Sequence, residues 1–79
     1  MTEQEILEQL RQIAAQVLGR TDFELTEKTK LQKTPQISSF ARVQLICAVE
    51  DAFDISIPNS AIKSLKDVKS LIRFIQKNQ

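Results

Sequence analysis

The chain has 79 residues, close to the size at which one hydrophobic core becomes marginal, so we expect residues 1–79 to form one domain. A net charge of +1, a single cysteine and no histidine argue against general nucleic-acid attraction, an internal disulfide and a zinc or other metal cluster. No apolar run approaches the roughly 20 residues of a membrane span, and no signal-peptide pattern opens the chain. We therefore expect a cytoplasmic protein with no membrane or nucleic-acid partner.

The first predicted element is an amphipathic helix over residues 3–18. Its apolar residues recur at steps of three and four, which places them on one face. Thr2 followed by Glu5 has the form of a capping box, and Gly19 follows in the position of a C-terminal cap.

A long connection follows over residues 20–37. A loop of this length is often functional in a compact domain. Its apolar residues are isolated and show no helical or strand period. We expect Phe23, Leu25 and Leu31 to attach this loop to the core.

The second helix is predicted over residues 39–53, a stretch with neither glycine nor proline that makes about four turns. It is apolar on more than one side, which is typical of a helix that is central in the core or that binds a partner. Spacing alone leaves both alternatives open for Phe40, Val43 and Cys47. We interpret Cys47 as a small buried hydrophobe rather than a reactive thiol.

The rest of the chain predicts a short helix over residues 59–63 and a last helix from about 66 to 77, capped by either Ser64 or Asp67. The basic residues of this last helix are interpreted as a solvated face, because no Tyr or Trp accompanies them for nucleic-acid stacking. The predicted core contains Ile6, Leu10, Ile13, Val17, Leu31, Leu45, Val49, Phe53, Ile57, Ile62, Val68, Leu71, Ile72 and Ile75.

Three motifs resemble those of the acyl carrier proteins. Ser38-Ser39-Phe40 stands where that family has D-S-L, Val43-Gln44-Leu45 where it has V-E-L, and residues 53–58 read F-D-I-S-I-P like its F-D-x-x-I-P. The spacing needs no gap, and the resemblance covers nearly the whole chain. It implies an all-α fold, a small bundle of three main helices and one short helix with a long first loop.

The resemblance also implies a non-catalytic carrier. The Ser39 hydroxyl would take 4′-phosphopantetheine covalently from coenzyme A through a phosphopantetheinyl transferase, and Ser38 is the second, less favoured hydroxyl. The arm would hold acyl or aminoacyl groups for the synthases, ligases or transferases of fatty-acid, polyketide or related biosynthesis. We expect a monomer. Nothing in the sequence assembles a catalytic nucleophile–base pair.

The chain departs from the family where partners bind. Ser38 replaces the family's Asp, and Ala41, Arg42 and Gln44 stand in a region where the family is acidic. Because charge complementarity mainly sets partner choice, the expected partners differ from those of the general fatty-acid carrier. The predicted partner-binding residues are Phe40, Arg42, Val43 and Cys47. The alternative is an unmodified helical interaction domain that docks through Phe40, Val43 and Cys47.

Overall fold

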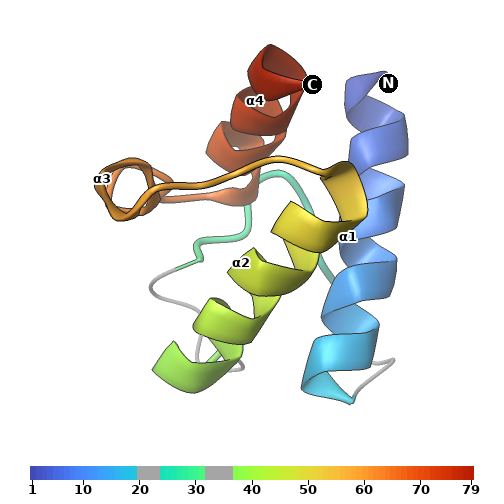
Figure 1. Ribbon diagram of the computed structural model, residues 1–79. Helices are drawn as coiled ribbons and strands as arrows, with labels where there is room; N and C mark the ends of the chain where they lie inside the picture. The colour runs from blue at the N-terminus through green and yellow to red at the C-terminus, as the bar shows by residue number, and fades with distance from the viewer. Residues whose placement is uncertain (20–23, 32–36) are drawn as a thin grey trace.

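The structure is a computed structural model that describes residues 1–19, 24–31 and 37–79 (Figure 1). This part of the chain contains four helices and no strand, which confirms the predicted fold class. The helices are α1 (Glu3–Leu18), α2 (Ser39–Phe53), α3 (Asn59–Ile62) and α4 (Val68–Asn78). None of them is both long enough and apolar enough to cross a membrane.

The first helix is capped at both ends as predicted. The Thr2 hydroxyl accepts a hydrogen bond from the Glu5 backbone N–H at 3.2 Å, and the Thr2 N–H donates to the Glu5 carboxylate at 2.9 Å. The bond from the Thr2 backbone is the main reason why the pKa of Glu5 lies below its ordinary value. Gly19 ends the helix with a φ of 65°, a left-handed conformation that glycine adopts without steric cost.

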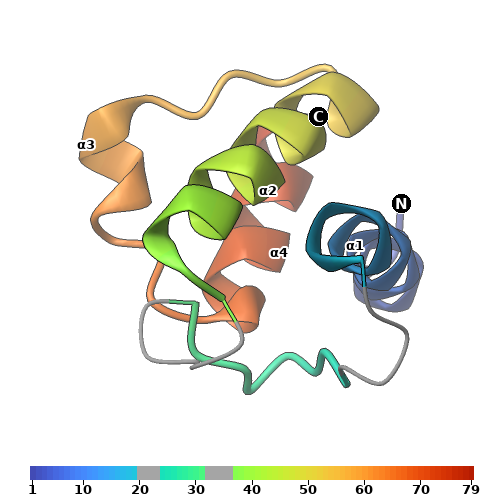
Figure 2. The ribbon, with the colours of Figure 1, turned by 90° about the horizontal axis from the view of Figure 1, so that it is seen from below.

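The helices are arranged around α1, which contacts both α2 and α4. Both of these helices run in the opposite direction to α1 (Figure 1). Figure 2, seen from below, shows α3 on the far side of α2 from α1. One face of α2 is therefore covered by the bundle, and its start lies at the edge of the molecule.

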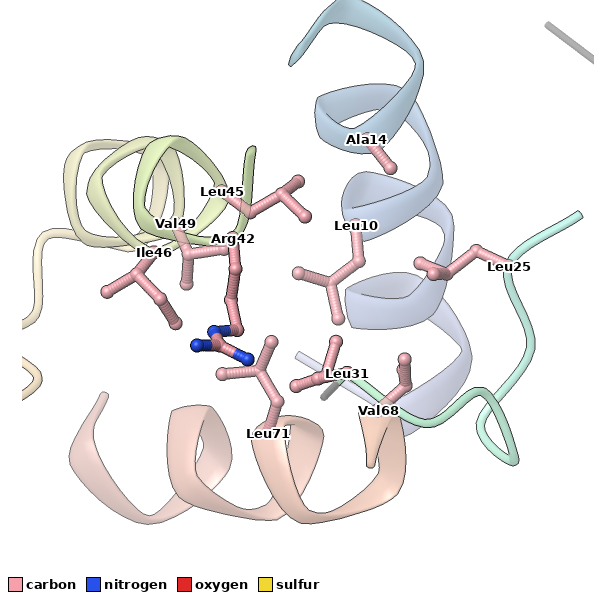
Figure 3. Close-up of a pocket in the computed structure, with 10 residues that line it drawn as sticks. All are labelled: Leu10, Ala14, Leu25, Leu31, Arg42, Leu45, Ile46, Val49, Val68 and Leu71. Atoms are coloured by element: carbon pink, nitrogen blue, oxygen red, sulfur yellow. The ribbon is translucent and has the colours of Figure 1, made fainter. Parts of the chain in front are cut away.

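The core fills the space between these helices, and its most buried side chains are those of Ile6, Val49, Val68 and Ile75. Most predicted core residues are buried; Ile13, Leu45 and Ile62 instead pack against the core with part of their surface exposed, and Val17 is half-buried. On α2, Ile46 is buried, whereas Leu45, which was predicted to be a core residue, extends toward Leu10 of α1 and keeps part of its surface exposed (Figure 3). The remaining buried apolar residues are Leu7, Ala14, Leu25, Ile37, Ile46 and Leu65.

The long loop is attached to the core as predicted at Leu25 and Leu31, which are both buried. Arg11 of α1 donates a hydrogen bond from its Nε to the Leu25 carbonyl at 2.8 Å, which holds the loop against α1. Phe23 lies outside the described residues.

The same loop is bonded by its backbone to the segment that begins α4. The Leu31 N–H donates to the Lys66 carbonyl at 2.9 Å, and the Val68 N–H donates to the Thr29 carbonyl at 3.0 Å. These bonds satisfy backbone groups that would otherwise be unpaired beside the core.

The last helix begins two residues later than predicted because Asp67 is its N-cap. The Asp67 carboxylate accepts hydrogen bonds from the Ser70 backbone N–H at 2.9 Å and from the Ser70 hydroxyl at 2.7 Å. Ser64, the alternative cap, instead donates its hydroxyl to the Ala61 carbonyl at 2.8 Å. The hydroxyl of Ser70, followed by its N–H, lowers the pKa of Asp67 below its ordinary value of 3.8.

Two valines on α2 test the direction in which this helix faces. Val49 is 1% exposed and Val43 is 60% exposed. Val49→Ala should lower the free energy of unfolding by about 2 kcal/mol, since it removes two buried methyl groups and leaves a cavity. Val43→Ala should change it by less than about 0.5 kcal/mol. Urea denaturation measures both, and equal losses would contradict the assigned burial.

The Asp67 cap should make stability depend on pH. Because the folded-state pKa is depressed, the stabilising contribution is complete above the ordinary value of 3.8 and is lost as the pH falls through the lowered value. Asp67→Asn keeps a capping acceptor but cannot titrate. The stability of the wild type relative to this variant should therefore decrease in acid.

Ser70→Ala should raise the pKa of Asp67, measured by NMR titration of the carboxyl carbon; an unchanged pKa would disprove the assigned cause.

Candidate functional site

The start of α2 uses Ser38 to satisfy its free backbone N–H groups. Ser38 is the N-cap residue, and its hydroxyl accepts a hydrogen bond from the Ala41 N–H at 3.1 Å. Its carbonyl accepts from the Arg42 N–H at 2.9 Å, which closes the first turn. The Ser38 side chain is therefore engaged by the helix itself.

Ser39 is the first residue of α2 and is exposed. Within the described residues its hydroxyl makes no hydrogen bond, because the capping position belongs to Ser38. The helix start carries free N–H groups and about half a positive charge, which favour a bound phosphate. No acidic residue stands in the first turn of α2 to oppose that charge. The two candidate hydroxyls thus lie side by side but have different surroundings.

A strip of three side chains covers the outer side of α2. Phe40 is 73% exposed, Val43 is 60% exposed, and Cys47 is an exposed free thiol. They recur at steps of three and four, which places them on one face of the helix. The interpretation of Cys47 as a buried hydrophobe is wrong, because it lies about 100° around the helix from the inward Ile46. We call Phe40, Val43 and Cys47 the outer strip.

Arg42 differs from the outer strip because its side chain turns inward. It is half-buried, and it extends from α2 toward Leu71 of α4 (Figure 3). There it lines a small cavity of about 30 Å³ between α1, α2 and α4, and every other residue of the lining is apolar. The other lining residues are Leu10, Ala14, Leu25, Leu31, Leu45, Ile46, Val49, Val68 and Leu71.

Arg42 also lines a groove of about 320 Å³ on the α3 side of α2. The carboxylate of Glu50 lies in this groove and accepts a hydrogen bond from the Ile57 N–H at 2.7 Å. The sequence alone does not show which of the two neighbouring acids, Glu50 or Asp51, lies in the groove, because this depends on the orientation of α2. The other groove residues are Val43, Ile46, Cys47, Ile57, Asn59 and Ile62.

Comparisons with known proteins match the chain along most of its length. Residues 8–75 match the family model described as a phosphopantetheine attachment site. The acyl carrier protein of Thermobifida fusca (strain YX) is 33% identical over 76 residues, which cover 96% of each chain. That of Guillardia theta is 31% identical over 75 residues, covering 95% of this chain and 93% of the relative.

A solved structure agrees with these sequence matches. The solution NMR structure of holo acyl carrier protein from Geobacter metallireducens superposes with a TM-score of 0.81 at 25% identity. The match covers 91% of this chain and 83% of that protein. These matches support 4′-phosphopantetheine as the prosthetic group and a phosphopantetheine carrier role. Because the family model, the relatives and the fold all match over most of the sequence, the chain belongs to the acyl carrier protein family.

Proposed function

We propose that Ser39 bears the 4′-phosphopantetheine arm and that the protein presents acyl or aminoacyl groups to the enzymes of fatty-acid or related biosynthesis. The observation that carries this proposal is the capping of α2 by Ser38, through the 3.1 Å bond from the Ala41 N–H. Since Ser38 supplies the cap, the neighbouring hydroxyl of Ser39 is exposed and available for covalent modification. The residues present therefore fit the prosthetic group.

The attachment chemistry requires a separate phosphopantetheinyl transferase. The Ser39 oxygen attacks the phosphorus next to the pantetheine of coenzyme A and loses its proton. An oxygen–phosphorus bond forms, the pyrophosphate bond breaks, and adenosine 3′,5′-bisphosphate leaves. The new phosphodiester bears a negative charge at the start of α2, where the helix dipole stabilises an anion by about 0.3–1 kcal/mol.

The arm supplies a terminal thiol that holds the cargo as a thioester. The chain's own contribution is a surface that the loading and using enzymes recognise. We assign this role to the outer strip, because exposed apolar side chains grouped on one helix face mark interaction sites. The family's acidic surface is replaced here by Ala41, Arg42 and Gln44, so a partner does not need a strongly basic docking face.

The outer strip also supports a second candidate function. A helical domain that uses Phe40, Val43 and Cys47 to bind a protein partner does not need the arm. Such binding would survive Ser39→Ala, whereas a carrier would lose all function with the same substitution.

Intact mass spectrometry tests the proposed attachment site. Wild type, Ser38→Ala and Ser39→Ala are incubated with coenzyme A, Mg²⁺ and a broad-specificity phosphopantetheinyl transferase. The mass should rise by one phosphopantetheine in the first two proteins and remain unchanged in Ser39→Ala. If no protein is modified, even by the transferase of the native host, the carrier proposal fails and the interaction domain becomes the leading candidate.

The two substitutions should rank in the reverse order for stability: Ser38→Ala, which keeps the attachment site, should be the more destabilising. Ser38→Ala should lower the free energy of unfolding by about 1 kcal/mol, because it removes the hydroxyl that caps α2. Ser39→Ala should change it by less than about 0.5 kcal/mol, since this exposed hydroxyl has no structural partner among the described residues. Urea denaturation of the unmodified proteins measures both, and a larger loss in Ser39→Ala would contradict the division of roles.

A further inference from the structure

Arg42 is a half-buried residue, and its guanidinium forms no ion pair with any carboxylate of the described residues. Its side chain stands between the apolar cavity beneath α2 and the groove beside α3. A cation that is partly removed from water and next to apolar side chains is unfavourable unless an anion compensates it. Binding of an anionic group beside Arg42 would therefore be favourable.

The groove supplies both parts of a site for such a group. Ile46, Ile57 and Ile62 line it with apolar side chains that can cover hydrocarbon, and Arg42, a lining residue whose side chain carries a charged donor, stands beside them. A guanidinium presents two parallel N–H groups that match a carboxylate, which makes it better suited than an ammonium to bind one. The chemistry of the groove thus fits a short acyl chain that ends in a carboxylate.

Glu50, the other charged residue that lines the groove, does not compete with a bound anion for Arg42. Glu50 is eight residues from Arg42, about 12 Å along the helix axis, and its carboxylate accepts the hydrogen bond from the Ile57 N–H. Its distance limits both its attraction for Arg42 and its repulsion of an anion bound there.

The cavity beneath α2 is too small to be an alternative binding site for a long hydrocarbon chain. Its volume is about 30 Å³. A cavity that binds benzene has about 150 Å³, so this one admits no more than the end of a small group. The Arg42 side chain crosses from α2 toward Leu71 of α4 at this cavity (Figure 3), and a longer chain would have to displace the guanidinium from its surroundings.

We propose that Arg42 makes this carrier selective for acyl groups with a terminal carboxylate, which bind in the groove between α2 and α3. The proposal rests on the proposed function, since the cargo reaches the groove from the arm on Ser39. Arg42 lies one helical turn after Ser39, and side chains on a helix lean toward its N-terminus. It is thus the groove residue closest in sequence to the attachment point.

Two cargoes of equal length test this selectivity. The transferase is supplied with succinyl-coenzyme A or butyryl-coenzyme A, which differ in a terminal carboxylate or methyl group, and complete loading is verified by intact mass. In the wild type the succinyl form should melt about 4 °C above the butyryl form, and the difference should shrink at high salt. Arg42→Gln and Arg42→Met should abolish the difference, and Arg42→Lys should keep part of it.

Arg73→Gln is the matched control, because Arg73 is an exposed arginine of α4 that does not line the groove. It should leave the difference between the two cargoes unchanged. Equal melting temperatures for the two loaded wild-type forms would overturn the proposal. The proposal would also be overturned if the difference in melting temperature between the succinyl and butyryl forms persisted in Arg42→Gln and Arg42→Met. That result is expected if Arg42 pairs with the phosphate of the arm instead. Failure of loading, seen by mass alone, would instead count against the carrier function.

Discussion

The burial of one side of α2 against the bundle determines the position of every residue at the site. Ile46, Val49 and Phe53 face inward, at steps of three and four along the helix. Arg42 lies one turn before Ile46 on the same side, so its side chain must lie over the end of the core. A rotation of the helix by one residue, about 100°, would turn Val43 to the direction that Arg42 now has and would move Arg42 away from it.

The features that sequence predicted best depend on contacts within a few residues. The capping box of Thr2 and Glu5, the left-handed Gly19 and both ends of α2 are as predicted. The motif resemblance to acyl carrier proteins also led to the correct fold and family. Each of these signals is local, because a cap or a helix end is determined by side chains next to it in the chain.

The orientation of α2 could not be predicted from its sequence. A helix that is apolar nearly all round has no single stripe to identify its inward side, so packing against the rest of the bundle decides. For this reason Ile46 is buried whereas Leu45 keeps part of its surface exposed, and Cys47 is exposed. The inward Arg42 and the groove position of Glu50 follow from the same orientation, and both could be recognised only once it was known.

The backbone bonds between the loop and the start of α4 have a consequence for folding kinetics. Leu31 and Lys66 are 35 residues apart, and their bond can form only when the intervening chain has closed into a loop. Closing a loop of that length costs about 3 kcal/mol of chain entropy, whereas helices form from neighbouring residues. Rapid local helix formation is therefore followed by a slower non-local step that orders the loop and α4 together. Because α4 and the loop share these bonds, neither can detach from the core without breaking them.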